Sequence, residues 1–161
     1  NVMTQEGETE GYTASDHIRA LFNHSCPGLF DLCLVNDAPI PPSVMRGYTR
    51  EGAEPILCDR DACEALGVEV IIATADGSAG LKGLVTDGMA AVSDYTYLYT
   101  CGPEPMLKAV YSACKTSGQF SFEERMGCGF GACMGCSCET KYGNKRICKD
   151  GPVLEKEEIV W

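Results

Sequence analysis

Four cysteines near the C-terminal end of the sequence have the type and spacing to do chemistry. They follow the pattern C-x4-C-x2-C-x11-C and are Cys128, Cys133, Cys136 and Cys148. Three close thiolates and a more distant fourth one, in the arrangement C-x4-C-x2-C…C, can hold a [2Fe–2S] cluster. Glycines alternate with these cysteines and permit tight turns that aim backbone N–H groups at sulfur. We therefore predict a redox cofactor site in this segment.

Two other uses of cysteine have to be weighed against the cluster. Structural zinc sites usually show paired C-x2–4-C units, whereas here three ligands crowd into residues 128–136 and the fourth stands apart. Disulfides are less favoured, because the chain has an odd number of cysteines, 11, and shows no pattern typical of a secretory signal peptide. We interpret Cys138 as a spectator thiol. The spacing favours the iron–sulfur cluster and leaves zinc as the alternative.

Composition restricts the classes of partner. The chain has 161 residues and a formal net charge of −10, which argues against binding to nucleic acid because phosphates would be repelled. It contains no run of about 18 apolar residues, so we expect no membrane span. Reduced cysteines and iron–sulfur chemistry lead us to expect a cytoplasmic protein.

Helical and extended patterns alternate along the chain and must position the cysteines. The predicted helices span residues 13–26, 43–50, 60–66, 81–92 and 104–116, and the first begins at Thr13 as N-cap with Asp16 in its first turn. The predicted strands span residues 29–35, 55–58, 68–73, 96–100 and 120–123. This alternation predicts an α/β fold, a doubly wound (Rossmann-like) parallel sheet followed by a small C-terminal [2Fe–2S] cluster segment.

The second part of the sequence, residues 68–161, resembles the electron-transfer subunit of NAD-dependent (class 1B) dihydroorotate dehydrogenase. The matching segments are VEVIIATADGSAGLKGLVTD, YLYTCGPEPMLKAV, FEERMGCGFGACMGCSC and KRICKDGPV. That family belongs to the ferredoxin–NADP reductase superfamily and acts in pyrimidine biosynthesis. The resemblance implies a [2Fe–2S] cluster that relays electrons from FAD to a flavoprotein partner, the catalytic subunit that oxidises dihydroorotate.

The first part, residues 1–67, is similar to a different family. NVMTQEGETEGYTASDHIRAL, DLCLVNDAPIPP and YTREGAEPI resemble the C-terminal part of the 2-phospho-L-lactate transferase-like family, which includes gluconeogenesis factor. Members of that family bind nucleotides or sugar nucleotides on a Rossmann-like fold. The two resemblances meet at residues 66–70, which suggests a chimera. We therefore divide the chain into a Rossmann-like domain of residues 1–124, made of parts 1–67 and 68–124, and a cluster segment of residues 125–161.

The reductase resemblance also implies a nucleotide site, of which only part is present. Its cofactor-binding residues would come from two loops after strands, and they are Thr74, Asp76, Gly77, Cys101, Gly102 and Pro103. An ordinary strand-to-helix turn remains the alternative for the loop at Asp76. The glycine-rich turn that accommodates pyrophosphate is missing, because the loop of residues 36–42 has three prolines and no glycine. We expect NAD binding to be weak or lost.

FAD binding is also expected to be lost. Nothing before residue 68 has the pattern of an antiparallel flavin barrel, and the short flavin motif at residues 46–49 falls in a predicted helix, where we regard it as coincidental. Three hypotheses follow from these observations. The first is an electron carrier that forms part of an oxidoreductase, with Arg125 offsetting cluster charge. The second is a nucleotide or sugar-nucleotide binding module, and the third is a folded chimera without activity.

Overall fold

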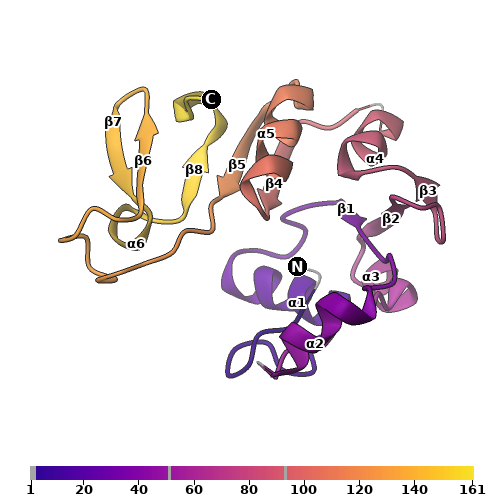
Figure 1. Ribbon diagram of the computed structural model, residues 1–161. Coiled ribbons are helices and arrows are strands. Elements are labelled where there is room, and N and C mark those ends of the chain that lie inside the picture. Colours follow the sequence, from indigo (N-terminus) through magenta and orange to yellow (C-terminus); the bar gives the residue numbers. More distant parts are fainter. Residues whose placement is uncertain (1–2, 51, 93) are drawn as a thin grey trace. The chain divides into compact units, whose positions relative to one another are not determined.

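A computed structural model describes residues 3–50, 52–92 and 94–161 of the chain (Figure 1). The chain packs into two compact units, Asn1–Ala91 and Val92–Trp161, and each is described by itself. This boundary is defined by packing, whereas the division after residue 67, between the two family resemblances, and the division after residue 124, before the cluster segment, stay predictions. No helix in the described ranges has both the length and the apolar character needed to cross a membrane.

The first unit contains a three-stranded parallel sheet. Its strands are β1 (Leu32–Val35), β2 (Glu69–Thr74) and β3 (Leu81–Lys82), in the order β1-β2-β3. Its helices are α1 (Ala14–His24), α2 (Pro42–Arg50), α3 (Arg60–Ala65) and α4 (Val85–Ala91). The buried core of this unit joins α1, α3 and β2 through Ile18, Cys63, Val68 and Val70. The Val- and Ile-rich sequence of β2 suits a strand that is covered on both faces.

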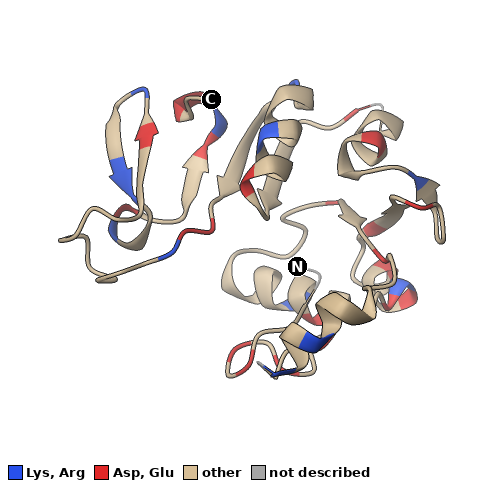
Figure 2. Ribbon diagram, viewed as in Figure 1, with Lys and Arg blue, Asp and Glu red and all other residues tan. Residues whose placement is uncertain are grey.

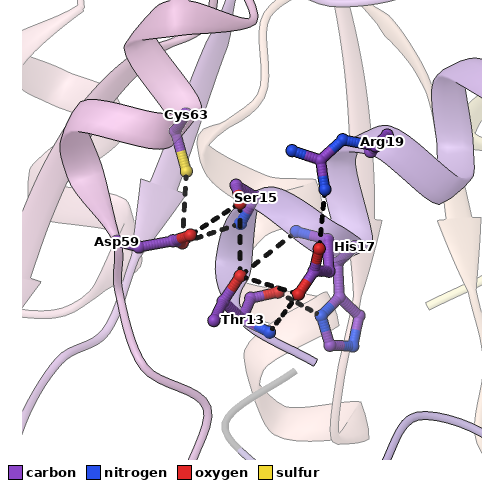
Figure 3. A network of polar contacts seen from close by, with 7 residues as sticks. Thr13, Ser15, His17, Arg19, Asp59 and Cys63 are labelled. Carbon is purple, nitrogen blue, oxygen red and sulfur yellow. Dashed lines mark hydrogen bonds and ion pairs between the residues drawn. The ribbon is translucent and has the colours of Figure 1, made fainter. Parts of the chain in front are cut away.

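Helix α1 begins where the sequence predicts it. Thr13 is the N-cap, and its hydroxyl and the carboxylate of Asp16 form a reciprocal capping box. A second carboxylate, that of Asp59 at the start of α3, accepts the backbone N–H of Ser15 at 2.9 Å and its hydroxyl at 2.6 Å (Figure 3). Partial burial alone would raise the pKa of Asp59, but the hydrogen bonds from Ser15 bring it below its usual value. Asp59 thus ties the first turns of α1 and α3 together.

The second unit builds its sheet from three strands and adds a hairpin. Strand β4 (Tyr97–Cys101) leads through α5 (Glu104–Ala113) to β5 (Ser117–Ser121), which pairs with it in parallel. Strand β8 (Val153–Glu155) extends the sheet in the antiparallel sense. The hairpin consists of β6 (Ser137–Thr140) and β7 (Gly143–Arg146), and it is followed by α6 (Ile147–Asp150). A 3₁₀ helix, η1 (Lys156–Glu158), follows β8.

Large apolar side chains hold the second unit together. Its fully buried members include Leu107, Phe120, Ile147, Leu154 and Ile159, and Phe120 and Leu154 are cross-strand partners in β5 and β8. The single tryptophan, Trp161, packs edge-on against Tyr111 with ring centroids 5.2 Å apart, and also contacts Phe120 and Phe122. Trp161 is 40% exposed, so it covers the edge of this aromatic cluster.

The α/β class with helices between parallel strands is confirmed, but three element predictions need correction. The predicted strand at residues 55–58 is reduced to an isolated bridge between Met3 and Pro55, since proline has no N–H to extend a ladder. The predicted helix 81–92 starts only at Val85, because β3 takes residues 81–82 and Gly83 adopts a φ of +149° before the helix. The last predicted strand, 120–123, lies at Ser117–Ser121.

Candidate metal centre

The four predicted ligand cysteines lie in the second unit, on either side of the β6–β7 hairpin. Cys128 and Cys133 occupy the extended segment between β5 and β6, which has no helix or strand (Figure 1). Cys136 immediately precedes β6 and is buried, whereas Cys148 lies in α6. The backbone N–H of Ile147 donates to the carbonyl of Cys136 at 3.1 Å. The hairpin therefore returns the fourth cysteine to the end of the segment that carries the other three.

Backbone N–H groups point at the sulfur atoms, as the sequence predicts. The N–H groups of Ala132 and Cys133 lie 3.3 and 3.5 Å from the sulfur of Cys128. The N–H of Gly135 lies 3.4 Å from the sulfur of Cys133, and the N–H of Cys148 lies 3.4 Å from the sulfur of Cys136. Such donors stabilise thiolate, which is the form of cysteine that binds metal.

The same contacts shift the cysteine pKa values in a pairwise manner. Hydrogen bonds, first from the backbone of Cys133 and then from that of Phe130, lower the pKa of Cys128 to about 6. The backbone N–H of Cys148 lowers the pKa of Cys136, and the Cys136 side chain in turn raises the pKa of Cys148. Cys136 is therefore the thiol of its pair that loses its proton more readily.

These interactions arrange the thiols as two pairs, Cys128 with Cys133 and Cys136 with Cys148. Within residues 3–50, 52–92 and 94–161, no group of three or more His, Cys, Asp or Glu side chains is placed to hold a single metal ion. A [2Fe–2S] cluster has two irons, each taking two protein ligands. The donor set, four thiols in two pairs with N–H groups aimed at sulfur, therefore fits a binuclear cluster.

Arg146 is a residue of this site that the sequence analysis did not identify. Its Nη1 donates to the carbonyl of Gly131 at 3.1 Å, and its Nε lies 3.2 Å from the carboxylate of Asp150. The signal that could have revealed it is a basic residue two positions before the fourth cysteine. Arg125, which the sequence analysis singled out instead, is exposed and forms no hydrogen bond or ion pair with any described residue.

The segment that carries the first three cysteines has no charged side chain of its own. Residues 126–138 carry none, and Glu123, Glu124 and Arg125 precede them (Figure 2). Apolar side chains stand out from the same stretch, with Met126, Phe130 and Met134 being 54%, 70% and 48% exposed. Met134 also has a φ of +60°, which is unusual for a residue with a side chain. The ligand segment thus presents an apolar surface.

The predicted nucleotide residues fall into two groups, one in each unit. In the first unit, the buried hydroxyl of Thr74 donates to the carbonyl of Ala79 at 2.8 Å and accepts its N–H at 3.1 Å. Asp76 accepts the N–H of Ser78 at 3.0 Å, and Gly77 has a φ of +77°. These contacts close the turn on itself.

The other group follows β4 in the second unit. The exposed thiol of Cys101 lies 4.0 Å from a carboxylate oxygen of Glu123, and Gly102 has a φ of +156°. Pro103 is the N-cap of α5. In the first unit, the proline-containing loop after β1 lines a cavity of about 310 Å³ together with residues 55–57. The assignment of all six residues to a nucleotide site stays a prediction.

Comparisons with known proteins match two families in separate parts of the chain. Residues 123–160 match the iron–sulfur cluster binding domain of dihydroorotate dehydrogenase B. Residues 1–75 match the family of 2-phospho-L-lactate transferase CofD. Both resemblances predicted from the sequence are thereby confirmed.

Individual relatives give the same result for the second part. The electron transfer subunit of dihydroorotate dehydrogenase B (NAD(+)) from Shouchella clausii is 50% identical over 97 residues, covering 56% of this chain and 38% of the relative. The corresponding subunit from Geobacillus sp. (strain WCH70) is 43% identical over 144 residues, covering 83% of this chain and 53% of the relative. The chain therefore spans about half or less of the length of these curated relatives.

A solved structure of an NADH-dependent reduced ferredoxin-NADP oxidoreductase is also similar. It is 28% identical, with a TM-score of 0.57, and the match covers 66% of this chain and 40% of that one. Its likeness supports the α/β fold described above. The chain thus joins a segment resembling the 2-phospho-L-lactate transferase CofD family to one resembling the electron-transfer subunit of dihydroorotate dehydrogenase B.

Proposed function

We propose that this chain carries electrons through a [2Fe–2S] cluster held by four thiolates, as part of an oxidoreductase of the dihydroorotate dehydrogenase type. The ligands would be Cys128, Cys133, Cys136 and Cys148. The observation that carries the proposal is the arrangement of these thiols in two pairs with backbone N–H groups directed at sulfur. The match of residues 123–160 to a cluster-binding family supports it.

When bound, the cluster would accept and release one electron at a time. The protein's part is to supply and shield the ligands. Backbone N–H groups around Cys128 and Cys136 offset the negative charge of the thiolates, and such hydrogen bonds set the reduction potential. Cys136 of the second pair is 2% exposed and Cys133 of the first pair is exposed, whereas Cys128 and Cys148 are both half-buried. The first pair is thus the side more open to an electron donor or acceptor.

The proposed partner is a flavoprotein, and specifically the catalytic subunit of a dihydroorotate dehydrogenase. The apolar side chains of Met126, Phe130 and Met134, which lie next to the first pair, would be covered when such a partner approaches. Close approach matters because electron transfer requires the donor and acceptor to be near each other. We place this reaction in the cytoplasm. We regard FAD binding by this chain as doubtful, since the described residues of its first unit form a parallel sheet of three strands and not an antiparallel barrel.

Anaerobic reconstitution of the full chain with iron and sulfide tests the proposal. We expect about two irons and two labile sulfides per chain and a visible absorption that dithionite bleaches. Serine in place of Cys128 or Cys148 should abolish this absorption. Cys138→Ser is the matched control, because its thiol lies within the same hairpin region but bonds only the neighbouring carbonyl of Glu139. A colourless wild-type product, or equal cluster content in all variants, would refute the ligand assignment.

Nucleotide binding is the second candidate function, and the turn at residues 74–80 is the feature that bears on it. Its hydroxyl and carboxylate groups already bond within the turn, which leaves few of them for a ligand. A thermal shift with NAD, FAD and UDP-sugars separates the two candidates, since a ligand that binds only the folded state must raise its stability. We expect no shift with any of these nucleotides.

A further inference from the structure

The side chain of Arg146 connects two pieces of chain that carry different cysteine pairs. Arg146 ends β7, two positions before Cys148. Its Nη1 reaches the carbonyl of Gly131, which lies between Cys128 and Cys133. The backbone of Gly131 also lies close enough to the thiol of Cys148 to favour its thiolate form. Two contacts therefore cross between the segment of the first pair and the segment of the second.

Asp150 holds the guanidinium group in place. Its carboxylate accepts the Nε–H of Arg146 at 3.2 Å and the backbone N–H of the same residue at 2.8 Å. The side chains of Arg146 and Asp150 are only 26% and 29% exposed, so the ion pair is partly shielded from solvent. A planar guanidinium fixed by a carboxylate on one edge can direct its other edge at a chosen acceptor.

The geometry at Gly131 requires this contact to be close. Gly131 is buried and has a φ of +87°, and buried backbone carbonyls are usually paired with a hydrogen-bond donor, here Arg146. A Cβ built on Gly131 would lie 2.9 Å from Cδ of Lys149 and 3.4 Å from Cδ of Arg146. The backbone of the ligand segment is thus packed directly against the side chains that flank Cys148.

We infer that Arg146 is a positioning residue that fastens the first-pair segment to the helix carrying Cys148, and that its charge raises the potential of the centre. This inference rests on the proposed function only for its second half. A fixed cation beside the thiolates favours the reduced state, because reduction adds negative charge. The fastening itself exists in the metal-free protein and can be measured without a cluster.

Limited chymotrypsin digestion of the metal-free full chain tests the fastening. Phe130 and Tyr142 are 70% and 81% exposed, and Phe130 adjoins Gly131 whereas Tyr142 lies at the hairpin turn. In Arg146→Gln we expect cleavage at Phe130 to be at least fivefold faster, with cleavage at Tyr142 unchanged as the internal control. Arg146→Lys should also be cleaved faster at Phe130, because a lysine cannot bond both Gly131 and Asp150 in the same planar geometry. Equal rates at Phe130 in wild type and Arg146→Gln would overturn the positioning role.

Redox titration of the reconstituted chain tests the charge effect. In Arg146→Gln we expect the reduction equilibrium to shift about tenfold toward the oxidised form, which is about 59 mV for a one-electron couple. Arg146→Lys, which keeps the charge, should shift less. Arg125→Gln is the control, because it removes a positive charge close to Cys128 in the sequence without removing a hydrogen bond. Its reduction potential should also shift less than that of Arg146→Gln. An unchanged potential in Arg146→Gln would overturn the charge effect, whereas a wild type that takes up no cluster would refute the proposed function and leave the digestion result standing.

Discussion

Replacement of Ile147 by valine should destabilise the second unit while leaving every candidate ligand in place. Ile147 lies between Arg146 and Cys148, and its side chain is 1% exposed. Its backbone N–H donates to the carbonyl of Cys136, so Ile147 holds the backbone next to Cys148 against the backbone of Cys136. The substitution removes one carbon from the core and keeps both the backbone hydrogen bond and the β-branched shape.

The size of the effect follows from the complete burial of this side chain. An Ile-to-Val change in a core costs about 0.5–1.5 kcal/mol, because the lost transfer free energy adds to that of the cavity left behind. For a unit of 60–100 residues, each 1 kcal/mol lowers Tm by about 4–8 °C. We therefore expect Tm of the second unit to fall by about 2–12 °C.

Fluorescence of Trp161 during heating of the metal-free chain measures this transition. It is the only tryptophan in the chain and its ring contacts Tyr111 and Phe122 of the second unit, so its signal reports that unit. Val160→Ala is the control, because its side chain is 45% exposed and its loss should change the free energy of unfolding by less than about 0.5 kcal/mol. A Tm for Ile147→Val equal to that of the control would show that this side chain is not packed as described.

Three further predictions concern the first unit. Ser15→Ala and Asp59→Ala, combined in a double-mutant cycle followed by urea unfolding, should show a coupling free energy of about 1 kcal/mol, and additive effects would contradict the hydrogen bond between them. Because the folded-state pKa of Asp59 is lowered, its stabilisation is present above about pH 4 and lost as the pH falls through the folded pKa, so Asp59→Asn should flatten the acid limb of a stability profile. Gly80→Ala should cost more than about 2 kcal/mol in circular dichroism melts, because its Cβ would lie 2.1 Å from the carbonyl oxygen of Ile72, whereas Gly28→Ala, with a similar φ and open surroundings, should cost about 1 kcal/mol.

Local signals in the sequence predicted local structure well. The first helix begins at Thr13 because its cap is formed by residues within one turn, Thr13 and Asp16, and needs no distant partner. The spacing of the cysteines likewise predicted N–H groups aimed at sulfur, since the donors are neighbours in the sequence. Such contacts are encoded within a few residues of each other.

Distant contacts could not be predicted in the same way. The contact of Arg146 with Gly131 spans 15 positions and depends on the hairpin between them. The start of α4 was placed too early because the apolar Leu81 and Leu84 fit a helical pattern, whereas pairing of Leu81 with Ala73 of β2 draws it into a sheet. In both cases the residue that makes the contact is too far away in the sequence to be included in a local hydrophobic pattern.

Strand β2 has a consequence for how such a chain can be cut. The match to the 2-phospho-L-lactate transferase CofD family ends at residue 75, just after this strand, and residues 69–72 of β2 pair with β1, with Leu32 opposite Glu69 and Val35 opposite Ile72. A fragment ending before β2, where the two resemblances meet, would remove the partner strand of β1. The backbone N–H and C=O groups of β1 would then be unpaired and its apolar side chains exposed. Strand pairing therefore decides which fragments can fold separately. A truncation intended to yield an independent cysteine-bearing fragment should cut after Ala91 rather than at residues 66–70, where the two resemblances meet.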